Sequence, residues 1–124
     1  MTNLKGIPLA VAVVAAFGLT ACSSAKSTPS ASGTAAVAAV VACGQVGAAL
    51  SDGPDPDADP LGYAEAQVIP LRQIHTRDTV LQGAIGKLAA AYQEFFTSNG
   101  TKTAKEAVSV ASSAINTICP GAAS

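Results

Sequence analysis

Residues 81–96 read LQGAIGKLAAAYQEFF, and this stretch decides the fold class. Its large apolar side chains recur at intervals of four and three residues, which places them on one face of an α-helix. Thr76 or Asp78 can cap the start of this helix, and Asn99-Gly100 suits a left-handed end. The stripe consists of Leu81, Ile85, Leu88, Tyr92 and Phe95, widened by Val80, Ala84, Ala91 and Phe96. An outward-facing Phe96 would instead contribute to a partner-binding patch.

A second helix is predicted just before the first. Asp59 and Pro60 form its start, with the aspartate as N-cap and the proline at the first helical position, where no backbone donor is needed. Pro70 removes one donor inside the helix, which predicts a kink near Gln67 and not the end of the helix. The apolar stripe of this helix consists of Leu61, Ala64, Val68 and Leu71, and His75 closes it.

The two ends of the folded part are also predicted to be helical. Residues 35–50 form a run of small apolar side chains. There, Ala39, Cys43 and Gly47 leave one face so slim that another helix can approach closely. Sixteen residues are too short for a membrane span, and the breaker SDGPDPDADP at 51–60 ends this helix. The last helix has a capping box made by Thr103 and Glu106. Its stripe is Ala104, Val108, Ala111, Ile115 and Ile118, and Cys119-Pro120-Gly121 ends it.

The N-terminal residues have the pattern of an export signal. Lys5 precedes an apolar run over 7–19, which fits the core of a signal peptide and is shorter than the roughly 20 residues of a bilayer span. Leu19-Thr20-Ala21-Cys22 closes the run and resembles the lipobox of small bacterial lipoproteins. The richness in Ala, Val and Gly is typical of the actinobacterial kind.

The resemblance implies a cut before Cys22 and attachment of a diacylglycerol, with palmitate-type chains, to its sulfur. The protein would then be lipid-anchored to the cell membrane on its extracytoplasmic face, because several acyl chains hold stably where one does not. The alternative is an ordinary secretory signal in which Cys22 is incidental. The resulting domain division is a lipoprotein signal peptide at 1–21, a lipidated flexible tether at 22–33 and one helical domain at 34–124.

The positions of the two remaining cysteines discriminate between two topologies, one with a straight helix over 60–98 and one with a reversal inside it. In an exported chain an even pair, Cys43 and Cys119, is expected to form a disulfide, the alternative being two buried free thiols. One straight helix over 60–98 would hold the two about 21 Å apart at 1.5 Å per residue, whereas a disulfide needs Cα atoms within about 7 Å. A reversal near 75–78 removes this conflict. The sequence therefore predicts an all-α, up-down-up-down four-helix bundle with one disulfide between its first and last helices.

Charged clusters offer weak signals for binding. Asp55, Asp57 and Asp59 begin like a calcium loop, but Pro60 and Ala66 stand where that loop needs glycine and glutamate, so we interpret them as a solvated acidic turn. The basic group of Arg72, His75 and Arg77 is either a solvated helix end or a contact for phosphate. A net charge of −1 and the lack of a basic patch argue against nucleic-acid binding.

The chain has no catalytic signature. It has one histidine and no cysteine left free, so hydrolysis by acid/base or covalent catalysis lacks its usual groups. We expect no enzyme activity, no cofactor and no metal. The prediction is a non-catalytic adaptor or interaction module of the cell envelope. Its partners would be the membrane, through Cys22, and an envelope protein. The alternative is a small ligand carrier that holds haem, a metal or a lipid, with His75, Tyr63 and Tyr92 as contacts.

Overall fold

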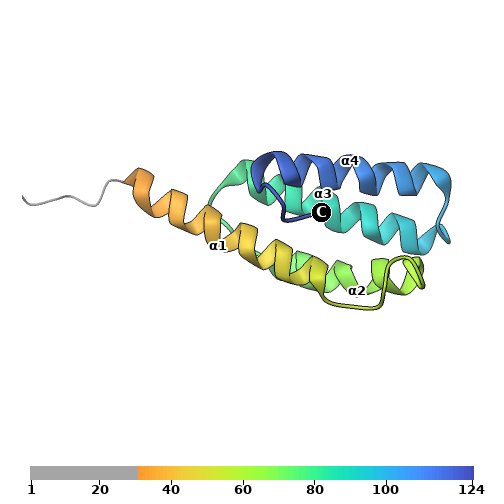
Figure 1. Cartoon of the computed structure of the whole chain (residues 1–124). Helices are drawn as coiled ribbons and strands as arrows, with labels where there is room; N and C mark the ends of the chain where they lie inside the picture. The colour runs from red at the N-terminus through yellow and green to blue at the C-terminus, as the bar shows by residue number, and fades with distance from the viewer. Residues whose placement is uncertain (1–30) are drawn as a thin grey trace, which may run out of the picture.

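The structure, a computed structural model, describes residues 31–124, with side chains from residue 33 onward. Lys5, the lipobox, Cys22 and the tether as far as residue 30 lie outside the described residues. Over the described part the chain forms four helices and no strand. They are α1 (Ala31–Ser51), α2 (Pro60–Gln73), α3 (Thr79–Thr97) and α4 (Lys102–Ile118), and successive helices run in opposite directions (Figure 1). The predicted all-α four-helix fold is confirmed.

Helix α3 is the centre of the bundle, and it packs against both α2 and α4. Its predicted stripe is confirmed, since Leu81, Ile85 and Leu88 are fully buried and Phe95 is partly buried. The predicted place of Val80 in this stripe is wrong, because its side chain is 69% exposed. Val80 stands in the first turn and about 100° around the helix from the middle of the stripe. Phe96 lies at the edge and is 37% exposed.

Two of the predicted helix starts are confirmed at the level of hydrogen bonds. The Asp59 carboxylate accepts from the Gly62 amide at 2.9 Å, and Pro60 occupies the first position of α2. The Asp78 carboxylate accepts from the Val80 and Leu81 amides, both at 3.0 Å, so Asp78 and not Thr76 caps α3. These side chains satisfy amides that have no partner within the helix.

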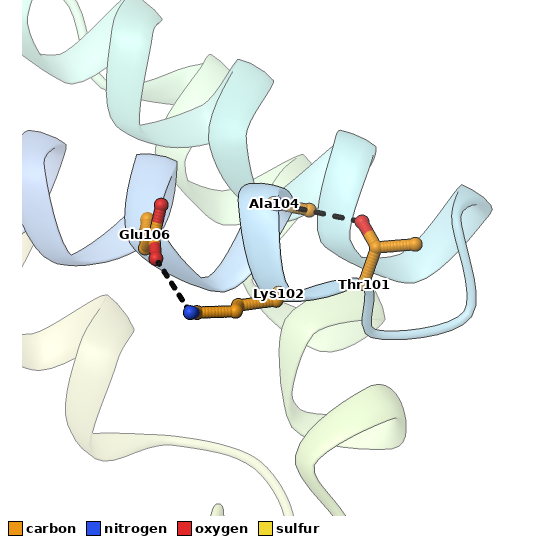
Figure 2. Close-up of polar contacts among 4 residues, drawn as sticks. All are labelled: Thr101, Lys102, Ala104 and Glu106. Atoms are coloured by element: carbon orange, nitrogen blue, oxygen red, sulfur yellow. Dashed lines mark hydrogen bonds and ion pairs between the residues drawn. The ribbon is translucent and has the colours of Figure 1, made fainter.

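The predicted capping box of α4 is wrong. The N-cap is Thr101, whose hydroxyl oxygen accepts from the Ala104 amide at 3.4 Å, as Figure 2 shows. The cause is the turn before it, where Asn99 and Gly100 both have positive φ and the Gly100 amide donates to the Phe95 carbonyl at 2.8 Å. This turn brings the chain into helix two residues earlier than predicted. Glu106 is therefore free to pair with Lys102, with a nitrogen–oxygen distance of 3.9 Å (Figure 2).

Helix α2 continues through Pro70, as predicted, but it ends before His75. The amide of Ile74 donates to the Leu71 carbonyl and closes the helix at Gln73. Ile74 turns inward and is 6% exposed, so it takes the buried place that the sequence spacing gave to His75. His75 is exposed, because the chain has left the helix before reaching it. The reversal between α2 and α3 lies at 74–78, where the cysteine argument required it.

Helix α1 begins at Ala31, four residues earlier than predicted, and only its second half belongs to the bundle. Ala42, Val46 and Ala49 are buried, whereas the first half extends beyond the other helices (Figure 1). Gly47 does lie on a slim face, but the backbone of Ala122, 3.9 Å from the position of a Cβ, covers it in place of a neighbouring helix. Residues 33–51 are long and apolar enough to cross a membrane by length and composition alone, so the prediction that this run is too short is wrong.

The predicted disulfide joins α1 to the end of α4. Cys43 and Cys119 are bonded, with their Cα atoms 5.4 Å apart, and Cys119 is almost fully buried. Apart from this bond, α1 packs mainly along α2. The disulfide therefore supplies a large share of what holds the first helix to the bundle.

Removing the disulfide should cost much of the stability. A bridge across a sequence separation of 76 residues restricts the unfolded chain by about 4.5 kcal/mol in the chain-entropy treatment. We expect the C43S/C119S variant to lose up to that amount in free energy of unfolding by urea titration, compared with the oxidised wild type. An unchanged unfolding midpoint would contradict the role given to the bridge.

The start of α4 can be tested with two threonines. Thr101→Ala removes the capping oxygen and should lower the free energy of unfolding by about 1 kcal/mol. Thr103→Ala is the matched control: this side chain is exposed within the helix, where alanine has the higher helix propensity, so the expected change is a gain of a few tenths of a kcal/mol. A larger loss for Thr103→Ala than for Thr101→Ala, in thermal or urea unfolding, would instead favour the capping box at Thr103.

Candidate functional site

Two of the three predicted ligand contacts come together in the structure. Tyr63 of α2 and Tyr92 of α3 meet edge to face, with ring centroids 5.8 Å apart and planes at 78°. The Tyr63 hydroxyl donates to the Leu50 carbonyl at 2.7 Å, which ties the end of α1 to α2. Such aromatic pairs stabilise the folded state by more than the burial of their apolar surface alone would give. The pair forms one wall of a cleft at this end of the bundle.

The cleft has a volume of about 490 Å³ and lies between the end of α1, the 51–56 segment and the last residues of the chain. Two carboxylates, Asp52 and Asp55, line it, and none of its lining residues is a lysine, arginine or histidine. The two acidic groups of a haem would therefore find no basic partner there. The complete lining is Gly47, Leu50, Ser51, Asp52, Gly53, Pro54, Asp55, Pro56, Tyr63, Tyr92, Gly121, Ala122, Ala123 and Ser124.

A buried glutamine holds the 51–59 loop against α2. Gln67 is 1% exposed, and its Nε2 donates to the Asp52 carbonyl at 2.6 Å. Its Oε1 is buried without a hydrogen-bond partner. Gly53 has a φ of +112°, and a Cβ there would lie 3.2 Å from Gln67 Nε2, so this position requires glycine for two reasons. In the sequence, Gln67 stands only at the predicted kink of this helix, and no spacing pattern there indicates its contact with the loop.

The C-terminal residues also form part of the cleft, which the sequence did not indicate. Asn116 exchanges two hydrogen bonds with Ala123: its Nδ2 donates to the Ala123 carbonyl at 3.0 Å and its Oδ1 accepts the Ala123 amide at 2.8 Å. Gly121, with φ +82°, makes the turn that allows this return. The chain after Cys119 is thereby folded back onto Gly47 of α1. Gly121 is the one signal of this turn in the sequence, and there it predicts only the end of the helix.

His75 lies at the other end of the bundle. It stands twelve positions after Tyr63, about 18 Å at the rise of a helix, and it is exposed beside Thr76 and Arg77. The structure therefore does not bring His75 together with the tyrosine pair. Within residues 31–124, no group of three or more His, Cys, Asp or Glu side chains is placed to hold a metal ion.

The acidic loop is arranged as a turn. Asp55 Oδ1 accepts from the Asp57 amide at 2.9 Å, and Asp59 is the N-cap of α2. All residues from 51 to 60 are exposed. These bonds are the ones expected of aspartates that stabilise a turn and a helix start.

In comparisons with known proteins, no family model, no curated protein and no solved structure matches this chain.

The burial of Tyr92 should appear in the alkaline pH dependence of stability. Desolvation, and then the neighbouring Tyr63, raise the pKa of Tyr92 above its ordinary value of 10. The folded protein therefore keeps a proton on Tyr92 that the unfolded chain releases above pH 10. The contribution of Tyr92 to the free energy of unfolding is thus fully present below pH 10 and decreases as the pH rises above it. We expect the free energy of unfolding to fall less steeply above pH 10 in Tyr92→Phe than in the wild type. Parallel curves would contradict this assignment.

Proposed function

We propose that this protein is a cell-envelope lipoprotein, held by a lipid on Cys22, whose helical domain is a non-catalytic interaction module on the extracytoplasmic face of the membrane. One observation carries the proposal: Cys43 and Cys119 are bonded to each other. Cys22 is then the one cysteine of the sequence that does not belong to this bond, and it stands at the end of an apolar run and after two small residues. A structural disulfide also suits an oxidising compartment outside the cytoplasm.

The arrangement of reactive groups supports a non-catalytic role. Histidine and cysteine are the side chains most used for general acid/base and nucleophilic catalysis near neutral pH. In residues 31–124 both cysteines are consumed by the bridge, and His75 is exposed at the end remote from the tyrosine cleft. A binding role needs neither group.

The acidic loop supports an adaptor role. It presents exposed aspartates and prolines over residues 51–60, at the end of α1 opposite to the end that leads to Cys22. A tethered bundle would hold this loop away from the lipid, where an envelope protein can reach it. Its proline content limits the conformational entropy that would be lost on binding.

The proposal is tested by the mass of the protein extracted from membranes of its own host or of an actinobacterial expression host. We expect an N-terminal peptide that begins at Cys22 and carries the mass of a diacylglycerol. The Cys22→Ala variant should lack this mass and leave the membrane fraction. The C43S/C119S variant is the matched control, because it loses two other cysteines and should still be acylated. A wild-type peptide without lipid would refute the proposal.

A further inference from the structure

The first half of α1 is an apolar surface without a partner in the described part of the chain. Val37, Val40 and Val41 are 65%, 72% and 56% exposed, and no charged residue occurs between Lys26 and Asp52. At 3.6 residues per turn, these valines point about 150° away from the buried stripe of the same helix. That stripe consists of Ala42, Val46 and Ala49. Helix α1 therefore has one face for the bundle and an opposite, apolar face.

The length of the preceding chain places this face near the predicted lipid. Ala31, the first residue of α1, stands nine positions after Cys22, with eight residues between them. Even fully extended, they reach about 30 Å. An acyl anchor on Cys22 would thus keep the first turn of α1 within that distance of the membrane surface.

The charge distribution favours the same orientation. His75, Thr76 and Arg77 lie across a groove from Thr34, Ala35 and Ala38 of α1, so the basic group at the α2–α3 connection belongs to the free end of α1. Asp78 is the one acidic residue at this connection, and its carboxylate is engaged with two amides of α3. The other seven acidic residues lie toward the opposite end, where they outnumber Lys102 and Lys105: Asp52, Asp55, Asp57, Asp59, Glu65, Glu94 and Glu106.

The packing decides how α1 can meet a bilayer. A spanning helix would carry Ala42, Cys43 and Val46 into lipid, but these residues are packed in the bundle or bonded to Cys119. Ala39 also packs against the core, so only the part of α1 before it is free, about 12 Å of helix at 1.5 Å per residue, less than half of a hydrocarbon core of about 30 Å. The unpaired amides of the first turn also disfavour deep insertion. A helix lying in the interface, with its apolar face toward the acyl chains, meets both constraints.

We propose that the valine face of α1, formed by Val37, Val40 and Val41, lies in the surface of an anionic lipid bilayer and orients the bundle on it. The inference rests on the proposed lipid anchor for its geometry. Arg77, which lines the groove beside this half of α1, then lies close to the anionic head groups. The anchor supplies attachment, and the α1 face supplies orientation.

The chain contains no tryptophan, so the fluorescence of a single introduced tryptophan reports the surroundings of that one position. Residues 22–124, which include all described residues, would be coupled through the Cys22 thiol to a maleimide lipid in phosphatidylcholine–phosphatidylglycerol vesicles with brominated acyl chains. Chemical coupling supplies the tether whether or not cells acylate Cys22. A failure here is therefore distinguishable from a failure of the proposed function.

We expect the V40W indole to show a blue-shifted emission and several-fold stronger quenching by the brominated chains than the V110W indole. Val110 is the matched control, since it is 70% exposed on α4. Adding V37D and V41D, both at exposed sites, should abolish the quenching while leaving the helical circular dichroism unchanged. Quenching of V40W no stronger than that of V110W would overturn the proposal. So would a blue shift that needs no vesicles and accompanies a doubled mass in light scattering, because the face would then bind a second copy of the chain.

Discussion

The bond between Cys43 and Cys119 is the constraint on which the arrangement of this protein depends. Helices α2, α3 and α4 share a continuous core of leucine, isoleucine and valine, with Leu71, Leu81, Leu88 and Ile115 at its centre. Helix α1 contributes Ala42, Val46 and Ala49 to that core, with Leu50 packed against it only in part, and alanines bury little area. The bridge therefore attaches a helix that packing alone would hold weakly. It also sets where α1 is held, and so which half of it lies free.

From this attachment follows a division of the molecule into two ends. One end carries the tyrosine pair, the polar cleft, the acidic loop and the returning C-terminus. The other carries the exposed half of α1, the α2–α3 connection and its arginines. Helix α1 runs from one end of the bundle to the other. A lipid at Cys22 would therefore bring the end with the exposed half of α1 close to the membrane, whereas the end with the acidic loop would lie farther from the anchor. The two proposals for this protein, an anchor and an oriented bundle, both use this polarity.

The sequence predicted those features that depend on strong local signals. The stripe of α3, the aspartate caps of α2 and α3, and the reversal near residue 75 required by the cysteine pair are all present. Its errors arose where tertiary structure or a neighbouring turn decides between close alternatives. Thr101 and Thr103 are both acceptable caps, and the left-handed Gly100 selects the first. His75 matched the helical spacing, but Ile74 is the residue that is buried there, because its side chain is apolar. The contacts of Gln67 and of Ala123 join segments that no spacing rule connects.

Hydrogen–deuterium exchange along α1 tests the central claim most directly, because amide protection follows tertiary attachment more closely than helical hydrogen bonding alone. In the free, oxidised protein, the amides of residues 43–50 should exchange slowly and those of residues 34–41 quickly, with the change near Cys43. On tethering to anionic vesicles, the fast group should become protected, while the exposed loop at 51–59 should not change. Uniform protection along the whole of α1 in the free protein would contradict the division of this helix into an attached half and a free half.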